Sequence, residues 1–330
     1  MATPVVTAPP SEAAIQRGPT LRQRVTNFMP VIALVAIIAA LSIKDPGFFT
    51  QSNLTAASKT AAPLIVLAAG ATLVVLCGGI DLSIAAMCSL STVLLAMWVP
   101  DLGAASVPAV ILAAGVIGAV QGVVHVVLRI PSFIVTLGGM SIFSAIALVI
   151  SDAGPIRLVD RDLLNWLNLY VGGYIPMSFA LALIVVAILT LIIKLTPIQS
   201  WISAIGYSES AARLAGSPVD FVKIGAFTVS GACAGLAAVM LVSRNFSGSP
   251  TMADNLLLPA VAAIVVGGTA ITGGHGSMWR SVAGALVVTL LRVGLPIVGV
   301  PSAYEQILYG AIIVIAVALT LDRSKVLIIK

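Results

Sequence analysis

The chain has 330 residues, of which 59% are hydrophobic and only 9% are charged, and its mean hydropathy is +1.13. About a quarter of the residues of a soluble domain are charged, so this composition excludes a chain that is surrounded mainly by water. The formal net charge of +5 does not indicate a nucleic-acid partner either, because the lysines and arginines lie at the ends of apolar runs, where a bilayer meets water.

The predicted elements begin with an N-terminal tail, residues 1–27, which is rich in proline, alanine and threonine and is expected to lie in the cytoplasm. Apolar runs follow that are long enough, or nearly so, to cross about 30 Å of hydrocarbon as helices. These ten runs cover residues 28–43, 60–79, 83–99, 104–127, 133–151, 176–196, 221–243, 256–271, 279–297 and 303–321. Residues 28–322 therefore predict one all-α, polytopic transmembrane domain, and residues 323–330 a cytoplasmic C-terminal tail. Several runs are short or contain glycine, so counts from eight to eleven spans stay open.

The orientation follows from lysine and arginine, because acidic residues contribute little to the topology bias. If the N-terminus is cytoplasmic, eleven of the 17 cations fall on the inner side and five on the outer side, while Arg292 lies within a span. This excess predicts that both termini are cytoplasmic. Residues 151–175 are then the main external loop.

Two glycine-rich links repeat one pattern. Residues 76–83 (LCGGIDLS) join two apolar runs, and residues 266–277 (VGGTAITGGHGS) join two others. Both links fall on the cytoplasmic side in this topology. Many transporters consist of two related halves packed about a central path, so the repeat predicts two pseudo-related halves. A chance likeness between glycine-rich joints is the alternative.

The segment at residues 201–218 is the most polar interruption between predicted spans. Ser208 is a good N-cap, Glu209 follows where the helix dipole favours an anion, and Arg213 lies four residues later, in the favourable order for an ion pair. Gly216, with a proline two residues beyond it, ends the helix. The pattern predicts a capped helix of two turns, too short to span the membrane.

One face of this helix carries the small residues Ala211, Ala212 and Ala215. Such a face allows another protein to approach closely, and Glu209 and Arg213 are then expected to pair with that protein. A helix that lies on the bilayer surface is the alternative, and the residues alone leave both open.

The run at residues 204–216 (AIGYSESAARLAG) resembles the cytoplasmic coupling segment of monosaccharide ABC permeases, the ribose, xylose and arabinose class of the branched-chain amino acid permease superfamily. The resemblance covers residues 30–322 and rests on further stretches that agree in order. These stretches are 78–83 (GGIDLS), 131–138 (PSFIVTLG), 230–237 (SGACAGLA), 267–274 (GGTAITGG) and 298–304 (VGVPSAY).

The resemblance implies a subunit of a bacterial cytoplasmic (inner) membrane importer. The implied partners are a second copy of the permease, a cytoplasmic ABC ATPase and a periplasmic or extracellular solute-binding protein. The sequence lacks the Gly-x-x-x-x-Gly-Lys-Ser/Thr phosphate loop. We therefore expect no catalytic residue and no bound cofactor in this chain, and we expect the ATPase partner to bind ATP and Mg.

The coupling segment, residues 201–218, is expected to be continuous with spans six and seven, so its displacement would tilt those spans. The residues implied in coupling are Ser203, Gly206, Ser208, Glu209, Ala211, Ala212, Arg213 and Gly216.

Two charges lie in or beside apolar runs. Asp81 directly precedes the third run together with Ser83, so N-capping of that helix and a role in the cytoplasmic gate are both open. Arg292 lies inside the ninth run. It lines the path and favours an anionic solute, or it pairs with Glu305 or Asp254.

Further path candidates have aromatic rings or polar side chains that suit sugars: Phe133, Thr136, Asn245 and Phe246. The three cysteines lie in apolar runs and the two histidines are far apart in the sequence, so no metal site is predicted. The expected solute is a monosaccharide or related polyol. The alternatives are a permease for a nucleoside or an anionic small solute, an ion-coupled secondary carrier and, least supported, an intramembrane hydrolase.

Overall fold

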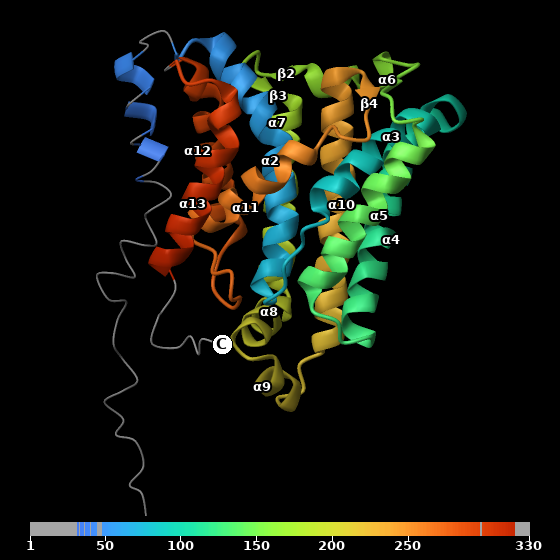
Figure 1. Cartoon of the computed structure of the whole chain (residues 1–330), viewed down its shortest axis with the longest axis vertical. Coiled ribbons are helices and arrows are strands. Elements are labelled where there is room, and N and C mark those ends of the chain that lie inside the picture. The colour runs from blue at the N-terminus through green and yellow to red at the C-terminus, as the bar shows by residue number, and fades with distance from the viewer. Residues whose placement is uncertain are drawn as a thin grey trace, which may run out of the picture.

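The computed structural model describes residues 32, 34–35, 37–39, 41–44, 48–297 and 299–320, and in these the chain is a bundle of helices (Figure 1). The two predicted tails lie outside the described residues, and the first predicted run is described only in part. The all-α fold class is confirmed. The long helices are α2 (Gln51–Leu76), α3 (Ile84–Leu102), α4 (Ser106–Val127), α5 (Ser132–Ile150), α7 (Met177–Leu195), α10 (Val219–Asn245) and α12 (Met278–Ile297).

These helices match seven of the predicted runs. Within the described residues, six helical stretches are long and apolar enough to cross a membrane, and one of them, with 44 residues, holds both α3 and α4. A 3-10 turn, η2 (Gly103–Ala105), joins those two helices. The tenth run appears as α13 (Glu305–Thr320), which follows the 3-10 turn η5 (Ser302–Tyr304).

The predicted eighth span, residues 256–271, is wrong as a complete crossing. Its helix, α11, covers only Leu257–Val266, and ten residues at 1.5 Å each reach about 15 Å, half of the hydrocarbon core. The hydropathy continues beyond Val266, but Gly267 and Gly268 end the helix there. The chain then runs as a non-helical link to α12.

The predicted external loop lies at the end of the bundle opposite the polar segment (Figure 1). Two short antiparallel strand pairs lie in this region. Strand β1 of the loop pairs with β4, which follows α10, and β2 pairs with β3 within the loop. The elements at this end are β1 (Ile156–Arg157), α6 (Asp162–Asn165), η3 (Trp166–Asn168), β2 (Tyr170–Val171), β3 (Ile175–Pro176) and β4 (Ser247–Gly248). The 3-10 turn η4 (Asp254–Leu256) lies deeper in the bundle, where Asp254 accepts from Ser89 of α3, and leads into α11.

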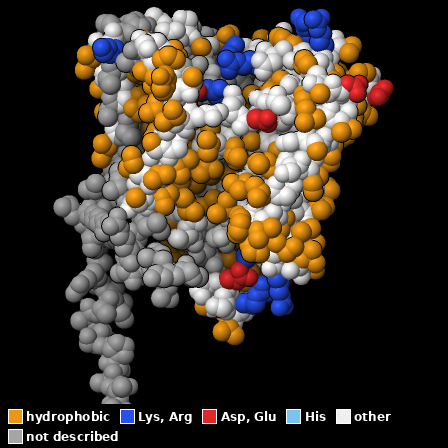
Figure 2. Space-filling view, in the orientation of Figure 1, with side chains coloured by type: hydrophobic (Ala, Val, Ile, Leu, Met, Phe, Trp, Pro, Cys, Tyr) orange, Lys and Arg blue, Asp and Glu red, His pale blue; other side chains and the backbone are white. Residues whose placement is uncertain are grey.

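Helices α2 and α10 form the centre of the bundle, with α3 to α5 on one side and α11 to α13 on the other (Figure 1). In their apolar stretches, 83% of α2 is buried but only 17% of α7, so α7 is a peripheral helix. On the face shown in Figure 2, charged side chains gather toward the two ends and apolar ones cover the zone between them. This distribution matches a protein that spans hydrocarbon between two aqueous layers.

Small residues bring α10 and α4 into backbone contact. A Cβ atom on Gly231 of α10 would overlap the carbonyl oxygen of Ala114, and one on Gly118 of α4 would overlap that of Phe227. Apolar surface gives helices little reason to associate in lipid, so their attraction comes from close packing, and small residues permit it. This contact therefore holds the central helix to its neighbour.

Two glycines of the same helix test this contact. Gly231→Ala should lower the free energy of unfolding by about 1 to 3 kcal/mol, because the added methyl group has no room. Gly225→Ala is the matched control, since no atom lies within 4 Å of a Cβ atom there, and it should leave stability unchanged or raise it by up to about 1 kcal/mol. Unfolding in mixed detergent micelles measures both. Equal effects of the two substitutions would contradict the packing argument.

Candidate functional site

The polar segment 201–218 lies at the end of the bundle that the lysine and arginine count assigns to the cytoplasm (Figure 1). It contains α9 (Glu209–Leu214), and the Ser208 hydroxyl caps this helix by accepting from the Ala211 backbone N–H at 3.3 Å. Gly216 has a φ of +79° just after the helix. The prediction of a short, capped helix is confirmed. A second helix before it, α8 (Ile198–Tyr207), was not predicted.

The segment is not helically continuous with the spans on either side, so that expectation is wrong. Helix α7 ends at Leu195, and Thr196 has an extended backbone before α8 begins. At the other end, Gly216 and Pro218 separate α9 from α10. Non-helical residues therefore separate this segment from both spans, and the extended Ser208 separates α8 from α9.

Four charged side chains tie α9 to the first turns of α10. The Arg213 guanidinium lies 3.2 Å from a Glu209 carboxylate oxygen and 2.6 Å from one of Asp220, and Lys223 donates to Glu209. The predicted pair of Glu209 with Arg213 is thus confirmed. Both residues have partners in their own chain, and 52% of the Arg213 side chain and 45% of the Glu209 side chain stay exposed.

These contacts also set the charge state of Glu209. Partial burial raises the pKa of the Glu209 carboxyl, but the hydrogen bonds and charges of Lys223 and Arg213 outweigh that effect, so its pKa lies below the ordinary value of 4.5. The carboxylate is ionised at neutral pH. Its bonds to both cations are then fully formed.

The surface of the segment is more apolar than its sequence suggested. Tyr207 is 71% exposed and Leu214 is 91% exposed, and neither was among the predicted coupling residues. Ala211 is also exposed, whereas Ala212 is buried in the chain's own core and takes no part in this surface. A leucine directly after Arg213 in an otherwise polar helix was the available signal.

Gly206 lies at a junction where three backbone segments meet. A Cβ atom on Gly206 would overlap both the Gly274 nitrogen and the Leu76 carbonyl oxygen. The Gly274 N–H itself donates to that oxygen at 2.9 Å. We call the contact among Gly206, Gly274 and Leu76 the glycine junction. It joins α8 directly to both glycine-rich links.

The two links begin with the same backbone turn, which explains the repeat in the sequence. After α2, Gly78 donates to the Val75 carbonyl at 2.9 Å and has a φ of +77°. After α11, Gly268 donates to the Val265 carbonyl at 2.8 Å and has a φ of +75°. Glycine adopts such values freely, so both helices end in equivalent left-handed caps. The structure therefore supports the predicted relation between the two links.

The first link, residues 77–83, is non-helical and rises from the foot of α2 to the start of α3 (Figure 1). Two side chains of α5 bond its backbone: Ile80 donates its N–H to the Ser132 hydroxyl at 3.0 Å, and the Thr136 hydroxyl donates to the Ile80 carbonyl at 3.1 Å. Backbone polar groups away from water need such partners. The predicted path residue Thr136 thus holds the link in place.

Asp81 connects this link to two other helices. One of its carboxylate oxygens accepts from the Ser83 N–H at 3.0 Å and from the Ser83 hydroxyl at 2.7 Å, and the other accepts from the Ser230 hydroxyl of α10 at 2.7 Å. The Ser83 hydroxyl also contacts Gln121 of α4. Ser83, and not Asp81, occupies the N-cap position of α3. The capping interpretation therefore needs correction: Asp81 makes an Asx-type turn and links helices.

Gln121, which is 5% exposed, was missed in the sequence. Its amide nitrogen also bonds the Ser83 hydroxyl, at 3.0 Å. An amide side chain in the middle of the apolar run 104–127 was the available signal, because polar residues there usually have partners inside a bundle.

The other predicted path residues lie elsewhere. Phe133 is 48% exposed on α5. Asn245 and Phe246 end α10 at the opposite end of the bundle, where Phe246 adopts a left-handed backbone with a φ of +49°. The Arg292 guanidinium lies 3.3 Å from a Glu305 carboxylate oxygen, so pairing within the chain, one of the two interpretations, is what the structure contains. The structure brings together only Asp81, Ser83 and Thr136.

Comparison with known proteins agrees with this architecture. The family model described as branched-chain amino acid transport system / permease component matches residues 53–317. The ribose import permease of Haemophilus influenzae is 33% identical over 291 residues, which are 87% of this chain and 90% of that protein. The ribose import permease of Bacillus subtilis is 34% identical over 90% of this chain and 92% of its own. The D-allose transport system permease of Escherichia coli is 32% identical over 88% and 91%.

The low pKa of Glu209 predicts an acid-sensitive α9. A carboxyl group whose pKa is lower in the folded than in the unfolded state stabilises the fold above its unfolded value, and this contribution is lost as the pH falls through the folded value. Between about pH 6 and pH 3, hydrogen exchange of residues 209–214, corrected for intrinsic rates, should therefore accelerate. Glu209→Gln should exchange faster at pH 6 and depend less on pH. An unchanged pH dependence in that variant would refute the assignment.

Proposed function

The chain belongs to the branched-chain amino acid transport system / permease component family, and from this premise we propose that it translocates a monosaccharide or a related polyol. As an ABC permease it is a multi-pass protein of the bacterial cytoplasmic membrane and a transport subunit rather than an enzyme. Its family implies an ABC ATPase and a solute-binding protein as partners. ATP and Mg are then held by the ATPase subunit.

The proposed solute class rests on the relatives and on one ion pair. Three relatives that cover most of the chain are named for ribose or D-allose. The Glu305 carboxylate neutralises Arg292 locally, which weakens the argument for an anionic solute. Nucleosides, amino acids and sugar acids are the competing solutes.

The observation that carries the proposed mechanism is the glycine junction. The ATPase would press on the exposed Tyr207 and Leu214 side chains and shift α8 and α9. Because Gly206 touches the backbone of both links, the shift reaches Leu76 and Gly274 without an intervening side chain. The first link also holds Asp81, whose bonds to Ser83 and Ser230 would rearrange as the path opens. The cytoplasmic gate would then lie at that network.

Two copies of the permease would assemble around one translocation path, as the resemblance to monosaccharide permeases implies. Light scattering of the purified permease in detergent measures the protein mass of the particle. A mass of twice 33.6 kDa is the expected result, and the mass of a single chain would contradict the assembly.

Uptake into proteoliposomes that hold the permease, its ATPase and its binding protein tests the solute class. Labelled ribose and allose should enter only when ATP is present on the ATPase side, whereas leucine, a nucleoside and ribonate should not. Uptake of leucine or of a nucleoside instead of the sugars would overturn the monosaccharide proposal.

In the same vesicles, Leu214→Asp should lower ATP-dependent uptake at least tenfold, because loss of about 1.4 kcal/mol of contact free energy is a factor of ten. Ser210→Asp, on the same exposed helix, is the matched charge control. The affinity of the binding protein for sugar should not change. Normal uptake by Leu214→Asp would remove Leu214 from the coupling surface.

A further inference from the structure

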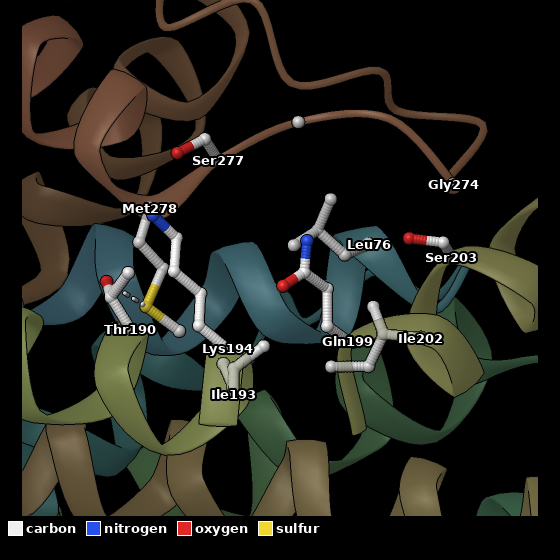
Figure 3. Close-up of a pocket in the computed structure, with 11 residues that line it drawn as sticks. Leu76, Thr190, Ile193, Lys194, Gln199, Ile202, Ser203, Gly274, Ser277 and Met278 are labelled. Atoms are coloured by element: carbon white, nitrogen blue, oxygen red, sulfur yellow. Dashed lines mark hydrogen bonds between the residues drawn. The ribbon is translucent and has the colours of Figure 1, made fainter. Parts of the chain in front are cut away.

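A cavity opens beside the glycine junction, at the cytoplasmic end of the peripheral helix α7. Its volume is about 110 Å³, and it lies between the end of α7, the first turns of α8 and the second link where that link enters α12 (Figure 3). Lys194, Gln199 and Ser203 rise from α7 and α8 toward the segment that carries Gly274 and Ser277 (Figure 3). Leu76 and Gly274 of the glycine junction line part of this cavity, and Ser203 was among the predicted coupling residues. The proposed coupling mechanism assigns the cavity no ligand.

The polar lining favours an anion. Lys194, Gln199, Ser203 and Ser277 all carry side-chain donors, and no aspartate or glutamate lines the cavity. Among the residues that the structure describes, Lys194 makes no ion pair. Gln199 likewise shows no side-chain hydrogen bond within that part of the chain. A cation together with free amide and hydroxyl donors can bind phosphate oxygens.

The position of the cavity favours a lipid as the source of the phosphate. Large apolar side chains form an exposed stripe along one face of α7: Ile184, Ile188, Leu191, Ile192 and Leu195, which are 48% to 76% exposed. By helical spacing, Lys194 lies between this stripe and the face of α7 that carries Thr190 and Ile193 into the cavity. This stripe faces hydrocarbon in a peripheral helix, and acyl chains can lie along it. Anionic lipids are enriched in cytoplasmic leaflets, and basic pockets between transmembrane helices bind their headgroups.

We propose that this cavity binds the phosphate headgroup of an anionic phospholipid, with Lys194 as its counter-ion and the α7 stripe along its acyl chains. The headgroup would bridge the α7–α8 connection and the Gly274–Ser277 segment. Both flank the glycine junction, so the bound lipid holds α8 against the second link. The lipid thereby stabilises the conformation described here, and the anionic lipid content of the membrane sets how readily α8 moves.

Native mass spectrometry of the full-length permease tests this site. The protein is released from micelles that contain equal amounts of phosphatidylglycerol and phosphatidylcholine. Lys194→Gln should lower the bound phosphatidylglycerol about fivefold, the effect of about 1 kcal/mol for one cation near an anionic surface. Lys194→Arg should retain the lipid. Arg129→Gln removes a cation at the same end of the bundle but outside the cavity, and it should bind as the wild type does.

A thermal unfolding series separates the two sources of phosphate. Phosphatidylglycerol should raise the unfolding temperature of the wild type but not of Lys194→Gln, and inorganic phosphate should raise neither. Equal stabilisation by inorganic phosphate would overturn the lipid assignment, and an unchanged lipid count in Lys194→Gln would overturn the site. Neither measurement needs transport or the ATPase, so a failure here is distinct from a failure of the proposed function.

Discussion

The need to satisfy backbone polar groups away from water governs this fold. Helices meet the need internally, but the chain interrupts its helices at residues 77–83 and 267–277, and each interruption frees N–H and C=O groups inside the bundle. Ser132 and Thr136 of α5 take up both polar groups of Ile80. Gly274 takes up the last carbonyl of α2. The interruptions are thus tolerated only because neighbouring helices supply hydrogen-bond partners at fixed positions. The conformation of each link therefore depends on the packing of the helices around it.

The same requirement explains why the polar side chains of the bundle converge. Asp81, Ser83, Ser230 and Gln121 come from the first link and two helices, and they bond mainly to one another. A buried carboxylate is costly unless it accepts hydrogen bonds, and here serines of two elements donate to it. Such a network has few alternative arrangements. That property suits a gate, which must have defined states rather than a continuum.

How much of this was predictable depended on sequence separation. The caps and ion pair of α9 are local, so Ser208, Glu209 and Arg213 were identified from spacing alone. The spans were predicted because hydropathy is also local, and the eighth failed because two glycines end α11 inside an apolar run. The glycine junction could not be predicted from the sequence, because Leu76, Gly206 and Gly274 are far apart along the chain. Leu214 was missed because its exposure depends on which face of α9 packs inward.

The absence of side chains at the glycine junction has a mechanical consequence. Where side chains separate two segments, a small displacement is absorbed when rotamers change, and part of the motion is lost. Gly206 contacts Leu76 and Gly274 through backbone atoms alone, and backbone atoms cannot absorb a displacement by changing rotamer. A small displacement of α8 would therefore be transmitted to both links together, and in the proposed mechanism these two distant parts of the chain would open at the same time.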